Sequence, residues 1–265
     1  MIPKIIHFVW LGNNEKPDCV LKCMESWKKY CPDYTIMEWS NESLKEISNV
    51  YVHQAVEHKK WAFASDYIRL KALYEYGGIY VDTDLEITNA LDSFLNYEFV
   101  SCAEDCKGAI LPMMTAFIAS APCHHIIQDL LAEYDDLEFI KNGELDMTPN
   151  TIRFKKYFKE KYGIEEPYDK SAIHNLEEGA VLLPASCFCL QETGKENYAI
   201  HHFEASWRDP YNRHELISLG RYRLVKFKRR ENIPDGPLPI KESEEIVFLR
   251  KVSSKRFVAV LRSVR

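Results

Sequence analysis

The stretch that decides the fold runs over residues 60–86, KWAFASDYIRLKALYEYGGIYVDTDLE. One set of apolar side chains within it repeats at spacings of four, three and four, which is the period of one helical face. Its members are Phe63, Tyr67, Leu70 and Tyr74. The pattern predicts a buried helix that ends at the pair Gly77-Gly78, where Gly77 can take the left-handed conformation that closes a helix.

A short strand is expected directly after this helix. Residues 79–81, Ile-Tyr-Val, are strand formers, and they lead into the triplet Asp82-Thr83-Asp84. Residues two apart on an extended chain face the same way, so Asp82 and Asp84 are expected to point at one divalent cation and at the phosphates it carries. The carboxyl end of a strand in an open α/β sheet is also where ligands usually bind.

The helix adds a second polar pair, because Asp66 and Arg69 are three residues apart and share a face. An isolated DxD triplet beside such a pair has a simpler explanation, namely a solvated acidic turn and a surface ion pair. A short motif decides between the two only when its context agrees.

The context is a resemblance that covers three segments. Residues 64–84, ASDYIRLKALYEYGGIYVDTD, resemble the signature of glycosyltransferase family 32, the DXD-containing sugar transferases, which include yeast initiating mannosyltransferases and bacterial capsule enzymes. The run is also similar to the glucosyltransferase domain of large clostridial toxins. Residues 2–12, IPKIIHFVWLG, and residues 201–207, HHFEASW, match the same family in the same order.

The resemblance implies an α/β protein with the GT-A fold, a Rossmann-like nucleotide-sugar-binding domain with an acceptor-side helical insertion. Residues 1–220 are then the catalytic domain, with 1–100 as the nucleotide-sugar-binding half and 101–220 as the acceptor half. Residues 221–265 are expected to form a basic C-terminal tail.

The resemblance also implies roles for residues of the helix and strand. Asp84 would hold Mn²⁺ or Mg²⁺ directly, and Asp82 would hold the metal directly or through water while it touches the donor ribose. Asp66 and Arg69 would hydrogen-bond the transferred sugar, for which the rigid fork of an arginine is suited. Tyr80 is expected to contact the donor as well.

Further donor and metal contacts are expected near the two ends of the catalytic domain. Trp10 lies beside a strand-end turn, where it is either a core tryptophan or, as the resemblance favours, a stacking surface for the donor base. His201 is expected as the third metal ligand by the family's H-x5-W pattern, with His202 as the competitor. Ser206 and Trp207 would complete the donor contacts.

The implied activity is metal-dependent, retaining transfer of a hexose or N-acetylhexosamine from a nucleoside-diphosphate sugar to a glycan or a lipid-linked glycan. Bacterial capsule or lipopolysaccharide synthesis would use such an enzyme. One alternative is a catalytically inactive protein that binds a nucleotide sugar. A DxD phosphohydrolase is disfavoured because Glu86 stands where Thr or Val is usual, and an EF-hand is disfavoured because Ile87 stands where Gly is needed.

Composition narrows the class of protein. The 265 residues include 46% hydrophobic and 28% charged residues, as in ordinary soluble proteins, and the net charge of -6 argues against a nucleic-acid partner. The eight cysteines are expected to be reduced thiols, since a chain of this length needs no disulfide framework. We see neither a signal-peptide pattern nor an apolar run of about 18 to 20 residues. We therefore expect a cytoplasmic protein, at most peripheral on the inner face of the cell membrane.

The rest of the chain predicts alternating elements. The first half should hold strands over 5–11 and 34–39, helices over 17–30 and 41–50, and a connection over 51–60. The second half should hold strands over 99–101, 115–120 and 181–184, with 187–190 continuing the last, and helices over 126–134 and 153–161. Residues 1–39 thus form a βαβ unit. His124 and His125 begin the helix over 126–134, where a cap or surface role is expected.

The last stretch, residues 246–265, carries six basic residues and no acidic one, interleaved with apolar residues. Such a segment could lie on an anionic membrane surface. It could equally be a basic helix or strand packed on the domain, because its apolar pattern is not one-sided.

Overall fold

A computed structural model describes residues 1–204, 214–228, 244–253 and 256–263. The chain divides into two compact units, Met1–Glu204 and Ala205–Arg265. The division falls before the expected boundary at residue 220, because Gly220 lies in the turn that joins the first two strands of the second unit.

Within residues 1–204 the largest sheet has seven strands in the order β11-β12-β5-β8-β3-β1-β2. Strands β2, β1, β3, β5 and β12 run parallel, and β8 and β11 run antiparallel to them. The bounds are β1 Ile5–Val9, β2 Thr35–Trp39, β3 Gly78–Val81, β5 Phe99–Cys102, β8 Phe117–Ser120, β11 His174–Glu177 and β12 Ala180–Leu183. The mostly parallel sheet confirms the α/β class predicted from the sequence.

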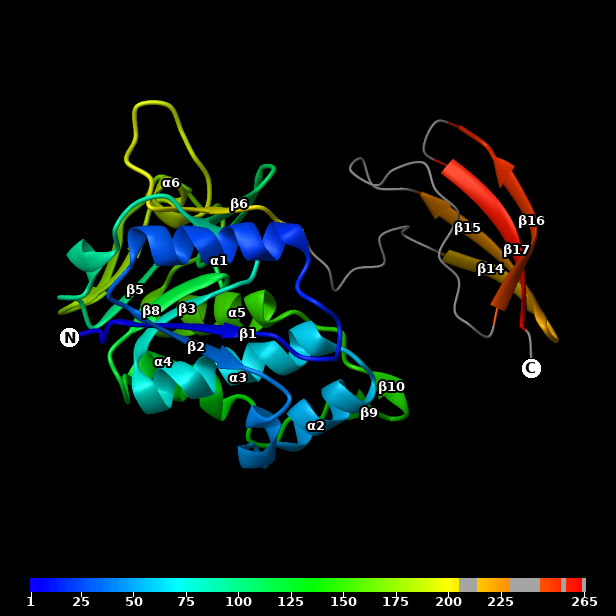
Figure 1. The fold of residues 1–265 in the computed structure, drawn as a ribbon, viewed down its shortest axis with the longest axis horizontal. Coiled ribbons are helices and arrows are strands. Elements are labelled where there is room, and N and C mark those ends of the chain that lie inside the picture. Colours follow the sequence, from blue (N-terminus) through cyan, green and yellow to red (C-terminus); the bar gives the residue numbers. More distant parts are fainter. Residues whose placement is uncertain (205–213, 229–243, 254–255, 264–265) are drawn as a thin grey trace. The chain divides into compact units, whose positions relative to one another are not determined.

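Helices cover both faces of this sheet (Figure 1). On one face lie α1 and α6, and on the other lie α2, α3, α4 and α5. The bounds are α1 Asp18–Tyr30, α2 Val50–Glu57, α3 Trp61–Tyr76, α4 His125–Ala132, α5 Asn150–Tyr162 and α6 Ala185–Phe188, with 3-10 turns η1 Ser43–Glu46 and η2 Asp92–Phe94. Each face therefore has its own buried apolar cluster, and strand side chains alternate between the two.

Strand β3 shows this alternation. Ile79 and Val81 point into the cluster under α1, whereas Tyr80 points into the cluster under α3. Helix α3 is buried beyond the predicted face, since Ala64, Ile68 and several other residues outside that face are buried, whereas the two tyrosines of that face are only partly buried. Strand β3 and helix α3 are thus both fixed by contacts on two sides, which holds the residues that follow them in place.

The junction between α3 and β3 depends on glycine. Gly77 has φ +62° and ψ -165°, so its φ is positive as predicted but its ψ is extended rather than helical. A Cβ at this position would lie 2.7 Å from Cδ of Pro122. Any other residue would meet both the backbone strain and this close approach.

The βαβ unit over residues 1–39 is confirmed, because β1 pairs in parallel with β2 and α1 connects them. The predicted connection over 51–60 is wrong, since it contains most of α2. Asn49 caps that helix by accepting the N–H of Val52 at 3.2 Å, and Tyr51 and Ala55 bury its inner face.

Two further predictions need correction. The helix expected over 41–50 is only the short turn η1. The strand expected to continue over 187–190 is replaced by α6, which starts directly after Pro184. Pro184 lacks the N–H that a strand ladder would need, so the strand does not continue through it, and proline is tolerated at the start of a helix.

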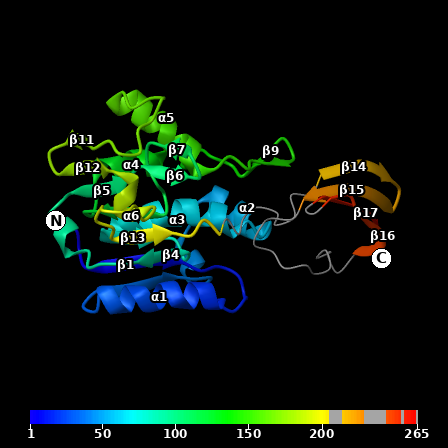
Figure 2. The same ribbon diagram turned by 90° about the horizontal axis from the view of Figure 1, so that it is seen from above.

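Small antiparallel pairs complete the first unit. They are β4 Leu85–Ile87 with β13 Ala199–His201, β6 Glu104–Cys106 with β7 Ala109–Leu111, and β9 Ile140–Lys141 with β10 Glu144–Leu145. Figure 2 shows β13 beside β4.

The described part of the second unit is a four-stranded antiparallel sheet in the order β14-β15-β17-β16. Its strands are β14 His214–Leu219, β15 Tyr222–Lys228, β16 Glu244–Lys251 and β17 Arg256–Ser263. Most described residues of the terminal stretch therefore lie in β16 and β17, which pair with each other, and β17 also pairs with β15. Contact of the stretch with a membrane stays a prediction.

A buried histidine, His7, lies in the middle of β1. Its Nε2 donates to the carbonyl of Gly77 at 2.8 Å, and its Nδ1 accepts from the indole N–H of Trp39 at 3.2 Å. Since Trp39 can only donate, these two contacts require the neutral ring. Burial lowers the pKa of His7 to about 4.

Acid is therefore expected to destabilise the protein through His7. The unfolded chain takes up this proton near pH 6.5 and the folded chain near pH 4, so the contribution of His7 to stability is complete above pH 6.5 and is lost as the pH falls toward 4. The loss amounts to about 3 kcal/mol. Urea unfolding of the native protein and of His7→Gln at pH 7 and pH 4.5 measures it. An equal loss of stability in both proteins would contradict the assignment.

Candidate metal and sugar-nucleotide site

The site lies at the carboxyl end of β3. The triplet Asp82-Thr83-Asp84 does not continue the strand as predicted but turns, with the N–H of Leu85 donating to the carbonyl of Asp82 at 3.0 Å. The backbone N–H of Asp82 is held by the carbonyl of Ala116 at 2.9 Å. The turn directs the two aspartates to different neighbours, while their carboxylates stay close to each other.

His201 reaches this turn through the pairing of β13 with β4, which places it opposite Leu85, the residue after Asp84. Its Nε2 lies 3.4 Å from Oδ1 of Asp84, and its side chain is 11% exposed. One ligand atom from each of Asp82, Asp84 and His201 can be chosen so that all three lie within 4.8 Å of one another. The structure thus brings together the three residues expected to bind metal.

The ionisation of Asp84 and His201 is linked. Burial alone would raise the pKa of Asp84, but the hydrogen bond and charge of His201, together with the N–H of Glu204 at 2.9 Å, outweigh it and lower the pKa. Burial alone would likewise lower the pKa of His201, but Asp84 outweighs it and raises the pKa. The Nδ1 of His201 is buried and has no hydrogen-bond partner among the described residues.

His202 directly follows the last residue of β13 and points elsewhere, as expected for neighbours on an extended chain. Its Nε2 lies 3.1 Å from Oε2 of Glu86, and its side chain is 42% exposed. Glu86 follows the triplet but takes no part in the cluster around Asp84. The geometry therefore favours His201 over its neighbour as the metal ligand.

Arg69 is the centre of the polar contacts behind the triplet. It is 4% exposed, and its guanidinium carbon lies 4.5 Å from the ring centre of Tyr80. Its five N–H donors face five oxygens, which are Ser65 O (3.3 Å), Ser65 Oγ (3.2 Å), Asp66 Oδ1 (2.9 Å), Asp82 Oδ1 (3.2 Å) and Thr115 O (2.7 Å). The hydrogen bond to a sugar that the resemblance implies would require one of these contacts to be replaced.

Tyr80 and Arg69 together fix Asp82. The hydroxyl of Tyr80 donates to Oδ1 of Asp82 at 2.8 Å, and Tyr80 itself is only 2% exposed. Both contacts use the same carboxylate oxygen of Asp82, so its Oδ2 remains for a ligand. Tyr80, expected as a donor contact, lies in the structure as a support for Asp82.

Asp66 lies behind Arg69 and is 7% exposed. Burial raises its pKa to about 7, while the charge of Arg69 acts in the opposite direction. The backbone N–H of Asn150, the first residue of α5, also donates to Asp66. The helix N-terminus thus stabilises the charged form of this carboxylate.

A group of unpaired polar atoms around Asp66 was missed in the sequence. Buried side-chain atoms without a hydrogen-bond partner in the described structure include Tyr134 Oη, Asn150 Nδ2 and Arg153 Nε. The charge of Arg153 acts on Asp66, and its guanidinium lies 5.7 Å from the ring centre of Tyr134. Unpaired buried polar groups are rare in folded proteins, so their gathering here indicates a place for a polar ligand. The Pro-Asn start of α5 gave no signal of it.

Trp10 follows β1 at the same edge of the sheet. It is partly exposed, its indole N–H donates to the carbonyl of Asn14 at 3.0 Å, and Nζ of Lys16 lies 5.7 Å from its ring centre. This position leaves part of the ring open for stacking. Ser206 and Trp207, the two other expected donor contacts, lie outside the described residues.

Metal dependence is expected to change far more in His201→Ala than in His202→Ala. Loss of His201 removes a proposed ligand, so we expect the metal concentration for half-maximal activity to rise by about 10- to 100-fold or more. His202→Ala, the matched control next to it, should shift this concentration less than twofold, within the scatter of about 0.5 kcal/mol for surface changes. Mn²⁺ is titrated into both variants after bound metal has been removed. A larger shift of this concentration in His202→Ala than in His201→Ala would show that His202 is the ligand.

Part of the chain is similar to known glycosyltransferases. Residues 17–100 match the family model described as a glycosyltransferase sugar-binding region containing a DXD motif. The resemblance to DXD-containing glycosyltransferases seen in the sequence is thereby confirmed over the stretch that carries Asp66, Arg69 and the triplet. The enzyme class predicted from the sequence agrees with that of the family.

Two relatives are named as sugar transferases. Inositol phosphoceramide mannosyltransferase 3 of Schizosaccharomyces pombe is 35% identical over 100 residues, which cover 36% of this chain and 28% of that protein. An uncharacterized glycosyltransferase of Acanthamoeba polyphaga mimivirus is 26% identical over 153 residues, which cover 54% of this chain and 61% of that protein. The matched part of the chain therefore spans less than two thirds of either relative.

Two solved structures to which the chain shows a weaker likeness are described as glycosyltransferases. PaToxG glycosyltransferase has a TM-score of 0.46 and 20% identity, covering 61% of this chain and 70% of that one. A glycosyltransferase involved in glycosylation of the major capsid of PBCV-1 has a TM-score of 0.43 and 12% identity, covering 77% and 95%.

Proposed function

We propose that the protein is a metal-dependent, retaining glycosyltransferase with the GT-A fold. It would transfer a hexose or an N-acetylhexosamine from a nucleoside-diphosphate sugar to a hydroxyl of a glycan. The observation that carries the proposal is the convergence of Asp82, Asp84 and His201 at the carboxyl end of β3, with both aspartates inside residues 17–100, the stretch that matches the DXD family model.

The residues present fit a divalent cation of the Mn²⁺ or Mg²⁺ kind. Two carboxylates supply hard oxygen ligands, and a histidine nitrogen is acceptable to Mn²⁺ in particular. The negative charge of Asp84 and Asp82, which raises the pKa of the His201 ring, also favours a cation at this place. Asp84 and His201 would hold the ion directly, and Asp82 would do so directly or through water.

When bound, the metal supplies Lewis-acid stabilisation of the charge that develops on the leaving diphosphate. The chain itself supplies position. Arg69 and Tyr80 hold one oxygen of Asp82, and the N–H of Glu204 holds one oxygen of Asp84, so that the two carboxylates keep a fixed spacing. Such preorganised groups need no rearrangement as the charge develops.

The sugar end of the donor would lie toward Asp66. Asp66 can accept from a sugar hydroxyl, and the unpaired amide nitrogen of Asn150 beside it can donate to one. The unpaired hydroxyl of Tyr134 adds a third polar group. At the opposite end of the donor, Trp10 would stack on the base, and Ser206 and Trp207 would add contacts.

Retention of anomeric configuration follows from the resemblance alone. Asp66, the carboxylate beside Arg69, is already engaged with that arginine. A front-face route in which the acceptor hydroxyl attacks directly is therefore the mechanism we propose.

The acceptor is proposed to be a glycan or a lipid-linked glycan, as in capsule or lipopolysaccharide synthesis. The yeast relative is named for a hexose, mannose, and for a lipid, inositol phosphoceramide, which supports a hexose donor and an acceptor carried on a lipid. Such an acceptor fits our expectation of a cytoplasmic enzyme that is peripheral on the inner face of the cell membrane.

The second unit offers a surface for such a membrane. Several of its apolar side chains are exposed, namely Leu216, Ile217, Leu219, Val247, Phe248, Leu249 and Val252. Arg250 and Lys251 on β16 and Arg256 on β17 are exposed as well, and each would contribute about 1 kcal/mol near an anionic surface. In the described part of the chain, every helix is too short or too polar to cross a bilayer.

Co-sedimentation with vesicles tests this membrane proposal. Vesicles that contain anionic lipid should bind the full chain and release it as salt is raised, whereas neutral vesicles should bind it weakly. A double variant, Arg250→Glu with Lys251→Glu, should lose binding to the anionic vesicles. Binding to anionic vesicles that is unchanged by salt and by this charge reversal would contradict the membrane proposal.

Release of nucleoside diphosphate from a panel of nucleotide sugars tests the proposed activity. With Mn²⁺ present, one donor should be hydrolysed slowly without an acceptor and faster with the correct one. Binding without any release would favour the alternative of an inactive sugar-nucleotide-binding protein. Release of phosphate from simple phosphomonoesters at a higher rate than from any nucleotide sugar would favour a phosphohydrolase.

A further inference from the structure

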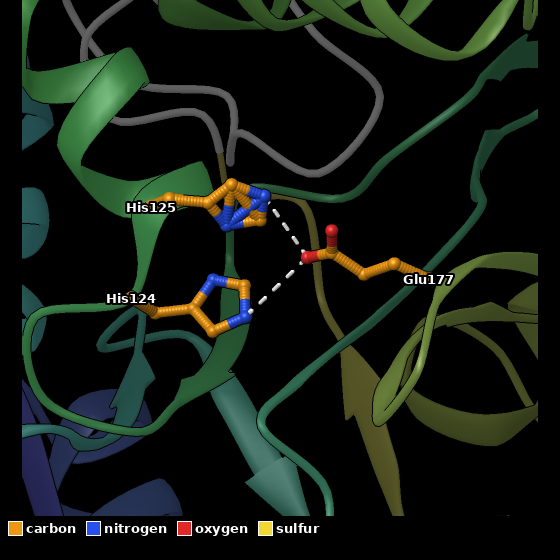
Figure 3. Close-up of side chains that lie close together, drawn as sticks. All are labelled: His124, His125 and Glu177. Atoms are coloured by element: carbon orange, nitrogen blue, oxygen red, sulfur yellow. Dashed lines mark ion pairs between the residues drawn. The ribbon is translucent and has the colours of Figure 1, made fainter.

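A second cluster of metal-binding side chains lies away from the proposed active site. It consists of His124 and His125, at the start of α4, and Glu177, the last residue of β11 (Figure 3). The Nε2 of His125 lies 3.0 Å from Oε1 of Glu177, and the Nε2 of His124 lies 3.7 Å from the same oxygen. One ligand atom from each residue lies within 4.8 Å of the others.

The strand register places this cluster at the opposite end of the strands from Asp84. Ser120, the last residue of β8, pairs with Gly78 at the start of β3, and α4 begins shortly after it. Glu177 pairs with Ala180 at the start of β12. The cluster thus lies at the amino ends of the parallel strands, whereas the DXD triplet follows the carboxyl end of β3. It cannot share an ion with that triplet.

We propose that His124, His125 and Glu177 form a zinc site with water as the fourth ligand. Two ligands that are each about 2.0–2.1 Å from a tetrahedral Zn²⁺ are about 3.4 Å apart. The two distances to Glu177, 3.0 and 3.7 Å, lie on either side of this value. Small shifts of exposed side chains would therefore complete the geometry.

The chemistry of the donors favours zinc over the cation of the active site. Two imidazoles and one carboxylate suit Zn²⁺, whereas Mn²⁺ and Mg²⁺ prefer mostly oxygen ligands. The side chains of His125 and Glu177 are 42% and 37% exposed, so an ion can enter and keep a bound water.

The ring of His124 is already held in place. It stacks on Phe99 with 5.7 Å between ring centres, and its Nδ1 accepts the N–H of Ile126 at 3.3 Å as the cap of α4. Binding zinc through Nε2 moves the ring proton to Nδ1, so this long hydrogen bond is given up. Zinc would then join the first turn of α4 to β11, an edge strand that pairs only with β12 in the described sheet. The role we infer is a structural link between helix and sheet edge.

Equilibrium titration of the metal-stripped full chain with Zn²⁺ tests the proposal. The native protein should bind at micromolar Zn²⁺ or below and gain thermal stability. His125→Gln and Glu177→Gln should each weaken binding by at least about 100-fold, the upper range for loss of a partner that merely supports a ligand. His124→Asn should do the same while it keeps the helix cap, because asparagine is a good N-cap residue.

Two variants serve as controls for other zinc ligands. Asp84→Asn removes the DXD site, and Cys123→Ser removes the exposed thiol next to His124. Both should bind zinc as the native protein does at the proposed site, and a Co²⁺ complex should lack the charge-transfer absorption of a thiolate ligand. The proposal is overturned if no saturable binding occurs, if the three ligand variants bind normally, or if either control abolishes the binding.

Discussion

Asp84→Asn is expected to abolish both sugar transfer and donor hydrolysis. The substitution keeps the size of the side chain and an oxygen that can accept the N–H of Glu204, but it removes the charge that a metal needs. We expect turnover to fall by about 1,000-fold or more, at least the effect of removing one electrostatic contact to a transition state. Turnover of a cognate donor at saturating Mn²⁺ measures this.

The same variant should fold normally. It loses the attraction between Asp84 and His201, but it also relieves the repulsion between Asp84 and Asp82, so the melting temperature of the metal-free protein should change little or rise slightly. Asp136→Asn, an exposed change of the same chemistry, is the control and should leave turnover intact. Full metal-dependent turnover in Asp84→Asn would show that the triplet does not bind the metal.

Arg69→Ala is expected to have the largest effect on stability. It leaves Asp66 buried without its partner and removes the support of Asp82, and breaking a buried pair in this way costs about 3–5 kcal/mol. Activity should be lost as well, since Asp82 is no longer fixed. Urea unfolding at pH 8, together with donor turnover, measures both effects.

Two comparisons separate this explanation from simple loss of packing. The pKa of Asp66 is raised to about 7, so at pH 5 its carboxyl is protonated and the penalty in Arg69→Ala should be smaller than at pH 8. The double variant Asp66→Asn/Arg69→Ala should regain part of the stability, because it leaves no buried charge. A penalty that is the same at both pH values and in the double variant would contradict the proposed role of the pair.

Local patterns predicted the elements that carry the site. The spacing from Phe63 to Tyr74 predicted α3, the glycine pair predicted its end, and the run before Asp82 predicted β3. Helix α2 was missed although Asn49 provides a cap and Tyr51 and the residues after it follow a helical period. In a helix of only eight residues the helical period repeats too few times to stand out from a loop.

Contacts between distant segments could not be predicted from local patterns. His201 meets Asp84 only because β13 pairs with β4, more than 100 residues away in the chain. One of the N–H donors of Arg69 is occupied by the carbonyl of Thr115, 46 residues away in the chain. The position of the unpaired side-chain amide of Asn150 is set by where α5 begins. The family resemblance supplied the choice of His201 over His202, and the strand pairing supplies its physical reason.

Anomalous scattering from crystals grown with Mn²⁺ and a nucleoside diphosphate tests the central claim most directly. The account predicts a manganese peak in contact with Asp84 and His201, with Asp82 in contact directly or through one water, and with the diphosphate on the open side of the ion. A manganese ion bound elsewhere, or a nucleotide bound at this edge of the sheet with no metal beside Asp84, would contradict it.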